Sequence, residues 1–455
     1  MNYRCRRLLF ILLAAFLCNF SNPAVAGNIR SESFFLNNGM QVVIIKNTKV
    51  PAISHMLWYK LGSVDEPEGK SGVAHFLEHL MFKGTAKYGS GQFSKIIAKY
   101  GGNDNAFTGT DFTTYFQNIA SSQLELVMDL ESDRMQNLLF DEEEVIKERD
   151  VILEERNSRV DNSPRALLRE QMMATLFLNH PYGTPIIGWR SEMEGLTLAD
   201  ARDFYIKNYS PNNAVLIISG DVDIEKVKPL AEKYYGNIKK SEKLIRRNMN
   251  DPVQISQRRV VLKDENVTQP EFYRYYMAPS QNTEGFEHCY SLILLSRILG
   301  EEATGRLYQE LVVKQKVAAN VSTYYDDVKL GPAIFAISAI PSAGYKIEDV
   351  EKAIDAVIKD ILENSVTDEE IKRNKNALIA ETIYAQEDLK TLAYFYGQAL
   401  SVGLDVDYVE KWDENIKKVS SESIKKAATY LFDLKKSVTG TLLLGPRNNS
   451  EAKND

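Results

Sequence analysis

An order of strands and helices that occurs twice is the feature that most constrains the fold of this chain. In the first half, apolar periodicity predicts strands over 39–46 and 52–60, helices over 73–82 and 91–100, further strands, a long helical stretch over 124–156, a helix over 198–208 and a strand over 214–219. The second half repeats this order over 260–263, 273–277, 290–299, 305–316, 318–324, 333–340, 347–362, 368–385 and 438–444.

The sharpest internal match lies in the helical stretches. E-V-I-K-E-R-D-V-I-L-E-E (144–155) aligns without a gap with E-I-K-R-N-K-N-A-L-I-A-E (370–381), which sets Glu155 on Glu381 and Glu148 on Asn374. Chance periodicity could produce one such match, but the shared order of elements favours a duplication. Strands in runs with helices between them indicate an α+β fold class, with two homologous domains that each pack helices on a mainly antiparallel sheet.

Composition supports two well-packed domains joined by a connector. The chain has 455 residues, of which 44% are hydrophobic. Residues 239–259 are polar and charged and contain Pro252, which is typical of an exposed connector. We therefore predict an N-terminal domain over 27–246 and a C-terminal domain over 247–455.

Residues 1–26 have the plan of a secretory signal peptide. Three arginines precede an apolar run over 8–18, and Ala24 and Ala26 form a small-residue cleavage site before Gly27. An uncleaved membrane anchor is the alternative, but the run is shorter than the roughly 20 apolar residues that a span needs. We expect a periplasmic or secreted protein with no stable membrane span after cleavage.

Cleavage would also change the charge and the cysteine count. It would lower the net charge from -7 to -10, because the segment holds three arginines and no acidic residue. So acidic a protein lacks the basic face that a nucleic-acid partner requires. Cys5 and Cys18 would be lost, leaving Cys289 without an intrachain disulfide partner.

The chemistry centres on an H-x-x-E-H motif. His75 and His79 are four residues apart on a predicted helix, so both imidazoles project from one face, and Glu78 lies beside them. Two neutral nitrogens for Zn²⁺ and a carboxylate that takes a proton from bound water are the parts of a zinc hydrolase site. The alternative is a pair of hydrogen-bonded core histidines, which would be expensive to satisfy beside a buried glutamate.

The other histidines occur singly, and we expect surface or capping positions for His55, His180 and His288. A catalytic zinc needs a third protein ligand and an open fourth position. Glu148 and Glu155 are two helical turns apart and share a face, so either could bind the metal while the other orients a ligand. We expect Asp150 and Glu154 to point into solvent.

The chain resembles the M16 inverzincin metallopeptidases, which include pitrilysin, insulin-degrading enzyme and the mitochondrial processing peptidase. The resemblance rests on H-x-x-E-H followed by Glu155 in E-R-D-V-I-L-E-E, and on G-G-N-D-N-A-F-T-G-T-D-F-T-T-Y (101–115), H-P-Y-G (180–183), N-Y-S-P-N-N-A (208–214) and G-D (220–221) in family order. It covers nearly the whole chain after residue 26. It implies a half-shell of the LuxS/metallohydrolase type, and the length is similar to the short members that pair two separate subunits.

The resemblance also implies roles for individual residues. His75, His79 and Glu155 would bind one Zn²⁺ per chain, Glu78 would be the general base, and Glu148 would orient a ligand. Asn105 and Ala106 would lie on an edge strand that holds a peptide substrate by main-chain hydrogen bonds.

One departure from the family concerns the side chains that stabilise the oxyanion of the tetrahedral intermediate. Active members use an arginine and a tyrosine seven residues later, whereas this chain has Val312 and Ala319 at those positions. We therefore expect the zinc-bearing subunit of a heterodimer whose homologous partner supplies the Arg/Tyr pair, since a homodimer would lack that pair. A non-catalytic peptide-binding or scaffold subunit is the alternative, and the signal segment disfavours a cytosolic cofactor-maturation peptidase.

Overall fold

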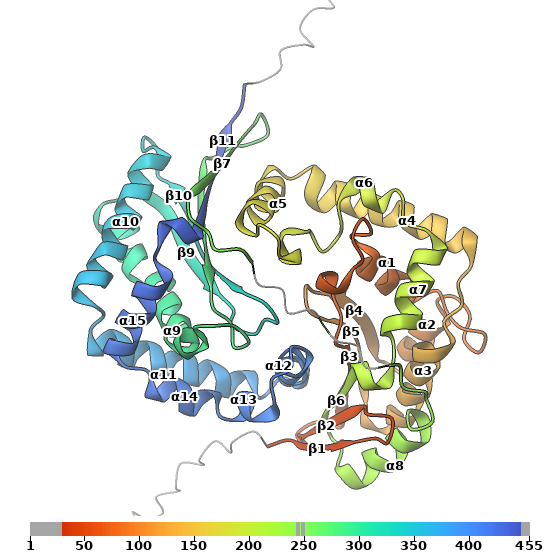
Figure 1. The fold of residues 1–455 in the computed structure, drawn as a ribbon. Coiled ribbons are helices and arrows are strands. Elements are labelled where there is room, and N and C mark those ends of the chain that lie inside the picture. The colour runs from red at the N-terminus through yellow and green to blue at the C-terminus, as the bar shows by residue number, and fades with distance from the viewer. Residues whose placement is uncertain (1–29, 243–245, 247–250, 447–455) are drawn as a thin grey trace, which may run out of the picture.

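The computed structural model describes residues 30–242, 246 and 251–446, which form two lobes that each pack helices on a sheet (Figure 1). The predicted signal peptide over 1–26 lies outside the described residues. Within the described ranges, no helix has both the length and the apolar character needed to cross a membrane.

The first lobe holds a six-stranded sheet with the order β1-β2-β6-β3-β5-β4. Its strands are β1 (Glu32–Phe35), β2 (Gln41–Lys46), β3 (Ala52–Tyr59), β4 (Asn103–Thr108), β5 (Thr113–Ala120) and β6 (Ala214–Gly220). β2 and β6 are parallel, and the other neighbours are antiparallel. β4 is therefore an edge strand that pairs only with β5 within this sheet.

The second lobe repeats this topology. Its strands are β7 (Arg258–Asp264), β8 (Glu271–Ala278), β9 (Ala318–Tyr325), β10 (Ala333–Pro341) and β11 (Ser437–Leu444), in the order β7-β11-β8-β10-β9. Apart from β1, the order matches the first sheet strand for strand, and the parallel pair again joins the first strand of the set to the last. The predicted α+β class and the duplication are confirmed.

Each half of the sequence contributes its own set of helices. The first has α1 (Val73–Leu80), α2 (Gln92–Lys99), α3 (Leu124–Asn137), α4 (Glu142–Arg156), α5 (Pro164–Leu176), α6 (Arg190–Met193), α7 (Leu198–Asn208) and α8 (Ile224–Tyr234). The second has α9 (Cys289–Gly300), the π-helical segment η7 (Tyr308–Lys314), α10 (Ile347–Asn364), α11 (Asp368–Ala385), α12 (Leu389–Ser401), α13 (Val406–Glu410), α14 (Trp412–Lys418) and α15 (Ser421–Leu431).

The long helical stretch predicted over 124–156 consists of two helices, because the chain breaks between α3 and α4. Leu138 has an extended ψ of 130°, and the Asp141 carboxylate accepts a hydrogen bond from the Glu144 amide at 3.1 Å, which starts a new helix. Three glutamates in the first turn of α4 favour that start through the helix dipole. The break allows α4 to take its own direction over α1.

The two lobes exchange one helix each. α5, from the first half of the sequence, packs on β7 and β11, while α12, from the second half, packs on β3 and β6. The first exchange buries Leu168, Met172, Leu176, Tyr275, Val438 and Leu442 in one cluster. The second buries Val43, Met56, Trp58, Val215, Ile217, Leu392, Tyr396 and Leu400 in another. Each sheet thus completes its packing with a helix from the other half.

Two glycines allow the exchanged helices to approach closely. A Cβ atom on Gly397 of α12 would lie 2.0 Å from the Trp58 ring, and a Cβ on Gly440 of β11 would lie 2.1 Å from the Met172 sulfur. Both contacts cross between the halves. The close packing of the two lobes therefore requires a residue without a side chain at each position.

Most of the described residues of the predicted connector over 239–259 are exposed, and two of its polar side chains contact the rest of the protein. Arg246 pairs with Asp65 at 2.7 Å and donates to the Ser401 carbonyl at 3.2 Å. Gln254 is buried and donates to the Leu176 carbonyl at 2.6 Å. Arg246 thus connects this segment to Asp65 and α12, and Gln254 connects it to the end of α5. The boundary at 246/247 stays a prediction.

Gly397→Ala is expected to lower the free energy of unfolding by about 1–3 kcal/mol, because the new methyl overpacks against a fully buried Trp58. Alanine in an open helical site would instead stabilise by about 0.5–1 kcal/mol. Denaturant unfolding measures the difference. Gly89→Ala is the control, since its Cβ meets nothing within 4 Å, and equal effects of the two substitutions would contradict the packing explanation.

Candidate metal centre

α1 carries the H-x-x-E-H motif between the first core and α4. Its apolar residues, including Val73, Phe76 and Leu77, are buried in that core. The Glu66 carboxylate accepts hydrogen bonds from the amides of Gly72 at 3.0 Å and Ala74 at 2.9 Å, so it satisfies donors at the start of the helix. The helix ends at Leu80.

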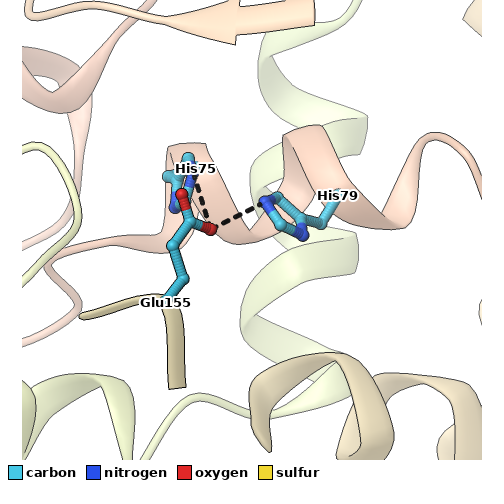
Figure 2. Close-up of side chains that lie close together, drawn as sticks. All are labelled: His75, His79 and Glu155. Atoms are coloured by element: carbon cyan, nitrogen blue, oxygen red, sulfur yellow. Dashed lines mark ion pairs between the residues drawn. The ribbon is translucent and has the colours of Figure 1, made fainter. Parts of the chain in front are cut away.

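His75, His79 and Glu155 converge between α1 and α4 (Figure 2). The Glu155 Oε2 atom lies 3.9 Å from Nε2 of His75 and 3.4 Å from Nε2 of His79. All three potential ligand atoms lie within 4.8 Å of one another. The sequence left the choice between Glu148 and Glu155 open, and the structure brings Glu155 within reach of both histidines.

Glu148 lies behind His79, on the side away from Glu155. Its Oε1 atom accepts a hydrogen bond from His79 Nδ1 at 2.8 Å, and its Oε2 atom pairs with the Lys83 ammonium. Burial would raise the pKa of Glu148, but these two bonds outweigh it and lower the pKa. The carboxylate stays charged and holds the His79 ring with Nε2 directed at Glu155.

The protonation of the two histidines differs. Burial, with the charges of His79 and Arg159, lowers the pKa of His75 to about 3, so this ring is neutral at pH 7. Burial also opposes protonation of His79, but the hydrogen bond that it donates to Glu148 and the charges of the Glu78, Glu148 and Glu155 carboxylates raise its pKa. The three carboxylates around His79 favour a positive charge at its ring. A bound divalent cation would supply that charge in place of a proton.

This donor set fits a zinc ion. Two imidazole nitrogens and one carboxylate oxygen are a common set for a catalytic zinc, with the fourth position left to water or substrate. A hydrogen-bonded core pair of histidines fits less well, because the buried Nδ1 of His75 has no partner among the described residues. The described ranges contain no other cluster of three or more such side chains.

Glu78 lies beside the three ligand candidates and is 8% exposed. Its Oε2 atom accepts a hydrogen bond from the Thr108 hydroxyl at 2.6 Å. Burial raises the pKa of Glu78, and the bond from Thr108 opposes that shift. A carboxylate whose pKa is raised in this way is suited to take up a proton.

Three contacts of the site were missed at the sequence level. Thr108 lies within the motif over 101–115, which is the signal that could have identified it. Lys83 follows α1. Arg159 lies in the π-helical turn η3 (Asn157–Asp161) and pairs with the Oε1 atom of Glu155 at a distance of 2.5 Å. Nothing in the spacing of Lys83 or Arg159 pointed to these roles.

The predicted substrate-binding residues lie on the edge strand nearest the motif. Asn105 and Ala106 are in β4, opposite Phe116 and Tyr115 of β5, and β4 contacts α1. Asn105 is exposed and Ala106 is half-buried. The outer main-chain side of β4 has no partner strand among the described residues.

The remaining candidates lie elsewhere. Asp150 and Glu154 are exposed on α4. His180 is buried and caps a short turn, where its Nδ1 accepts from the Tyr182 amide at 3.2 Å, and His288 is half-buried. The surface position predicted for His55 is wrong: it is fully buried and bonds to Gln117 at 2.8 Å. It lies in β3, a central strand in which every residue from Ile53 to Tyr59 is buried.

The second half has no equivalent of the three-residue cluster in its described part. Glu381, which aligns with Glu155, forms a two-fold ion pair with Arg297 of α9 at 2.7 Å. Val312 packs against the second core from η7, and Ala319 is exposed on β9. Neither side chain can donate a hydrogen bond.

Known proteins are similar to this chain over most of its length. Residues 41–189 match the family model described as insulinase (peptidase family M16), and residues 195–378 match the one described as peptidase M16 inactive domain. A zinc protease of Helicobacter pylori, PqqE, is 32% identical over 82% of this chain and 83% of its own length.

Solved structures show the same fold. The crystal structure of a protease from Helicobacter pylori superposes with a TM-score of 0.86 at 29% identity and covers 92% of this chain and 100% of that one. The first half of the periplasmic protease PqqL from Escherichia coli covers 91% of this chain and 92% of that one with a TM-score of 0.77 and 19% identity, which shows the fold alone. With its repeated lobes, its inverted motif and a relative of this identity, the chain belongs to the M16 peptidase family.

Proposed function

We propose that this chain is a zinc-dependent endopeptidase and the metal-bearing subunit of a heterodimer. One observation carries the proposal: His75, His79 and Glu155 converge beside a buried Glu78. A structural metal site would not need this second carboxylate. The relatives' names, such as zinc protease PqqE, support zinc as the metal, and the single three-residue cluster among the described residues supports one ion per chain.

The residues would share the work of hydrolysis as follows. When bound to His75, His79 and Glu155, zinc lowers the pKa of a water and polarises the scissile carbonyl. Glu78 takes the proton of the attacking water and passes it to the leaving amine. Glu148 keeps His79 in the tautomer that presents Nε2 to the metal.

The free edge of β4 would hold the substrate. An extended peptide added outside β4 would pair with the main chain of Asn105 and Ala106, next to α1. Such pairing reads the backbone more than the side chains, so it suits peptides and unfolded segments. Substrate selection would then depend on access to a closed chamber.

The missing oxyanion donors support a second subunit. Val312 and Ala319 stand where active family members have an arginine and a tyrosine. Each lost donor costs on the order of 2.7–4 kcal/mol in the barrier. A homologous M16 subunit that faces this one could supply both, whereas a homodimer could not.

A non-catalytic peptide-binding or scaffold subunit is the second candidate. The match of residues 195–378 to the inactive M16 domain and the absence of the Arg/Tyr pair favour it. The location is proposed to be periplasmic or secreted, from the signal segment and from the periplasmic neighbour PqqL.

Zinc content tests the metal site. His75→Ala and Glu155→Gln are expected to lose most of the zinc, because each removes one of three ligands, whereas Glu78→Gln keeps about one zinc per chain. Elemental analysis of the purified protein gives the numbers. His288→Ala is the control, since this residue lies in the second lobe. Zinc retained by His75→Ala would refute the assignment.

Peptide cleavage tests the role of Glu78. Glu78→Gln is expected to lower kcat by about 100-fold to 10,000-fold with zinc still bound, since the amide cannot take the proton. Cleavage of a fluorogenic peptide by the assembled enzyme is the measurement. Glu154→Gln, on the exposed side of α4, should leave kcat unchanged. Equal kcat in Glu78→Gln and wild type would refute the role of Glu78 as the base, whereas an assembled wild type that cleaves no peptide would favour the non-catalytic alternative.

The pairing is tested by adding a partner. The purified chain alone is expected to cleave peptide at least about 100-fold more slowly than its mixture with a homologous M16 chain from the same genome that carries the Arg/Tyr pair. Replacing that arginine in the partner should abolish the gain. Full activity of the isolated chain would exclude the division of labour.

A further inference from the structure

We propose that Thr108 is a positioning residue that orients Glu78 and couples it to the strand on which the substrate would dock. This inference rests on the proposed function, because it gives Glu78 a catalytic task. It deepens that function by naming a residue that touches neither metal nor substrate. The contact itself lies between β4 and α1.

Thr113, Thr108 and Glu78 form a chain of hydrogen bonds in which each hydroxyl donates toward Glu78. The Thr113 hydroxyl donates to the Thr108 hydroxyl at 3.4 Å, and the Thr108 hydroxyl donates to Oε2 of Glu78 at 2.6 Å. Thr113 is fully buried. In the described part of the chain, Thr108 is the side chain that donates to Glu78. It therefore sets which way the carboxylate faces.

The alternation of side chains along β4 places Thr108 on the face of the sheet that packs against α1. Asp104 bonds to Ser94 of α2 at 2.7 Å, Ala106 packs against the first core, and Thr108 reaches Glu78 of α1. These three residues share the face of β4 that meets the helices. Phe107 points to the opposite face and packs with the cluster around Trp58.

The turn after Thr108 is held from two sides. The Gly109 amide donates to the Phe112 carbonyl at 2.7 Å, and the amides of Ser63 and Val64 donate to the carbonyls of Gly109 and Thr110 at 3.1 and 3.0 Å. The buried Asp111 carboxylate accepts from the Tyr182 hydroxyl at 2.6 Å. Thr108 is thus fixed at the closed end of the hairpin, while the outer edge of β4 stays open.

This arrangement predicts a coupling between substrate and base. A peptide paired to Asn105 and Ala106 would lie two to three residues from Thr108 along the same strand. Because Thr108 is already fixed and bonded to Glu78, a peptide paired to this strand would be held in a set position relative to the Glu78 carboxylate. A misplacement of a catalytic group by about 1 Å can cost roughly 100-fold in rate.

Thr108→Val keeps the shape and removes the donor. We expect it to lower kcat by about 10-fold to 100-fold in the assembled enzyme, with KM and zinc content unchanged. Thr108→Ser should restore most of kcat. Thr114→Val is the matched control, because this buried threonine of the same hairpin bonds to the Leu57 carbonyl at 3.1 Å, away from Glu78. A wild-type kcat in Thr108→Val, or an equal loss in Thr114→Val, would overturn the proposal.

A second measurement does not depend on activity. In the metal-free chain, Thr108→Val should shift the unfolding midpoint less in a Glu78→Ala background than in the wild-type background, because the two side chains interact. Additive shifts would overturn the contact. If the assembled wild type cleaves no peptide, the proposed function fails, and this cycle still decides whether Thr108 holds Glu78.

Discussion

The exchange of α5 and α12 is the interaction on which the rest of the structure depends. Without α12, the face of β3 and β6 that carries Trp58 would be open to water, and without α5 the same would hold for β7 and β11. Burial of apolar surface is the main favourable term in folding, so neither half is expected to be stable alone. This explains physically why a half without a metal cluster persists: it covers the sheet that carries the site.

The site itself depends on how α4 crosses α1. Two carboxylates of α4 contact the histidines on different sides. Glu155 faces Nε2 of both rings, and Glu148 contacts Nδ1 of His79. Buried charges are tolerable only when paired, and here Lys83 balances Glu148 while Arg159 balances Glu155. In the second half, Arg297 and Glu381 join α9 to α11 at the aligned position. An ion pair thus takes the place of a three-residue cluster.

Much of this could be predicted from sequence, for reasons that local geometry explains. The i and i+4 spacing of His75 and His79 requires only a helix, and the duplication needs only the order of elements. Spacing alone could not choose between Glu148 and Glu155, because both share one face of α4 and only the placement of that helix separates them; the family resemblance supplied the choice of Glu155. The contact from Thr108, the helix exchange and the burial of His55 are tertiary facts, and no local pattern encodes them.

Val312 and Ala319 show what a division of labour would permit in a duplicated chain. A side chain that donates to an oxyanion must stay polar and free of the core, which costs packing. Val312 instead adds apolar contact to the second core, and Ala319 leaves the edge of β9 without a side chain that could donate. Once a partner supplies the donors, these positions are free to serve stability. In the proposed pair, the zinc subunit therefore keeps His75, His79, Glu155 and Glu78, which Thr108 orients. Its second lobe keeps the strand order of the first lobe without the Arg/Tyr pair.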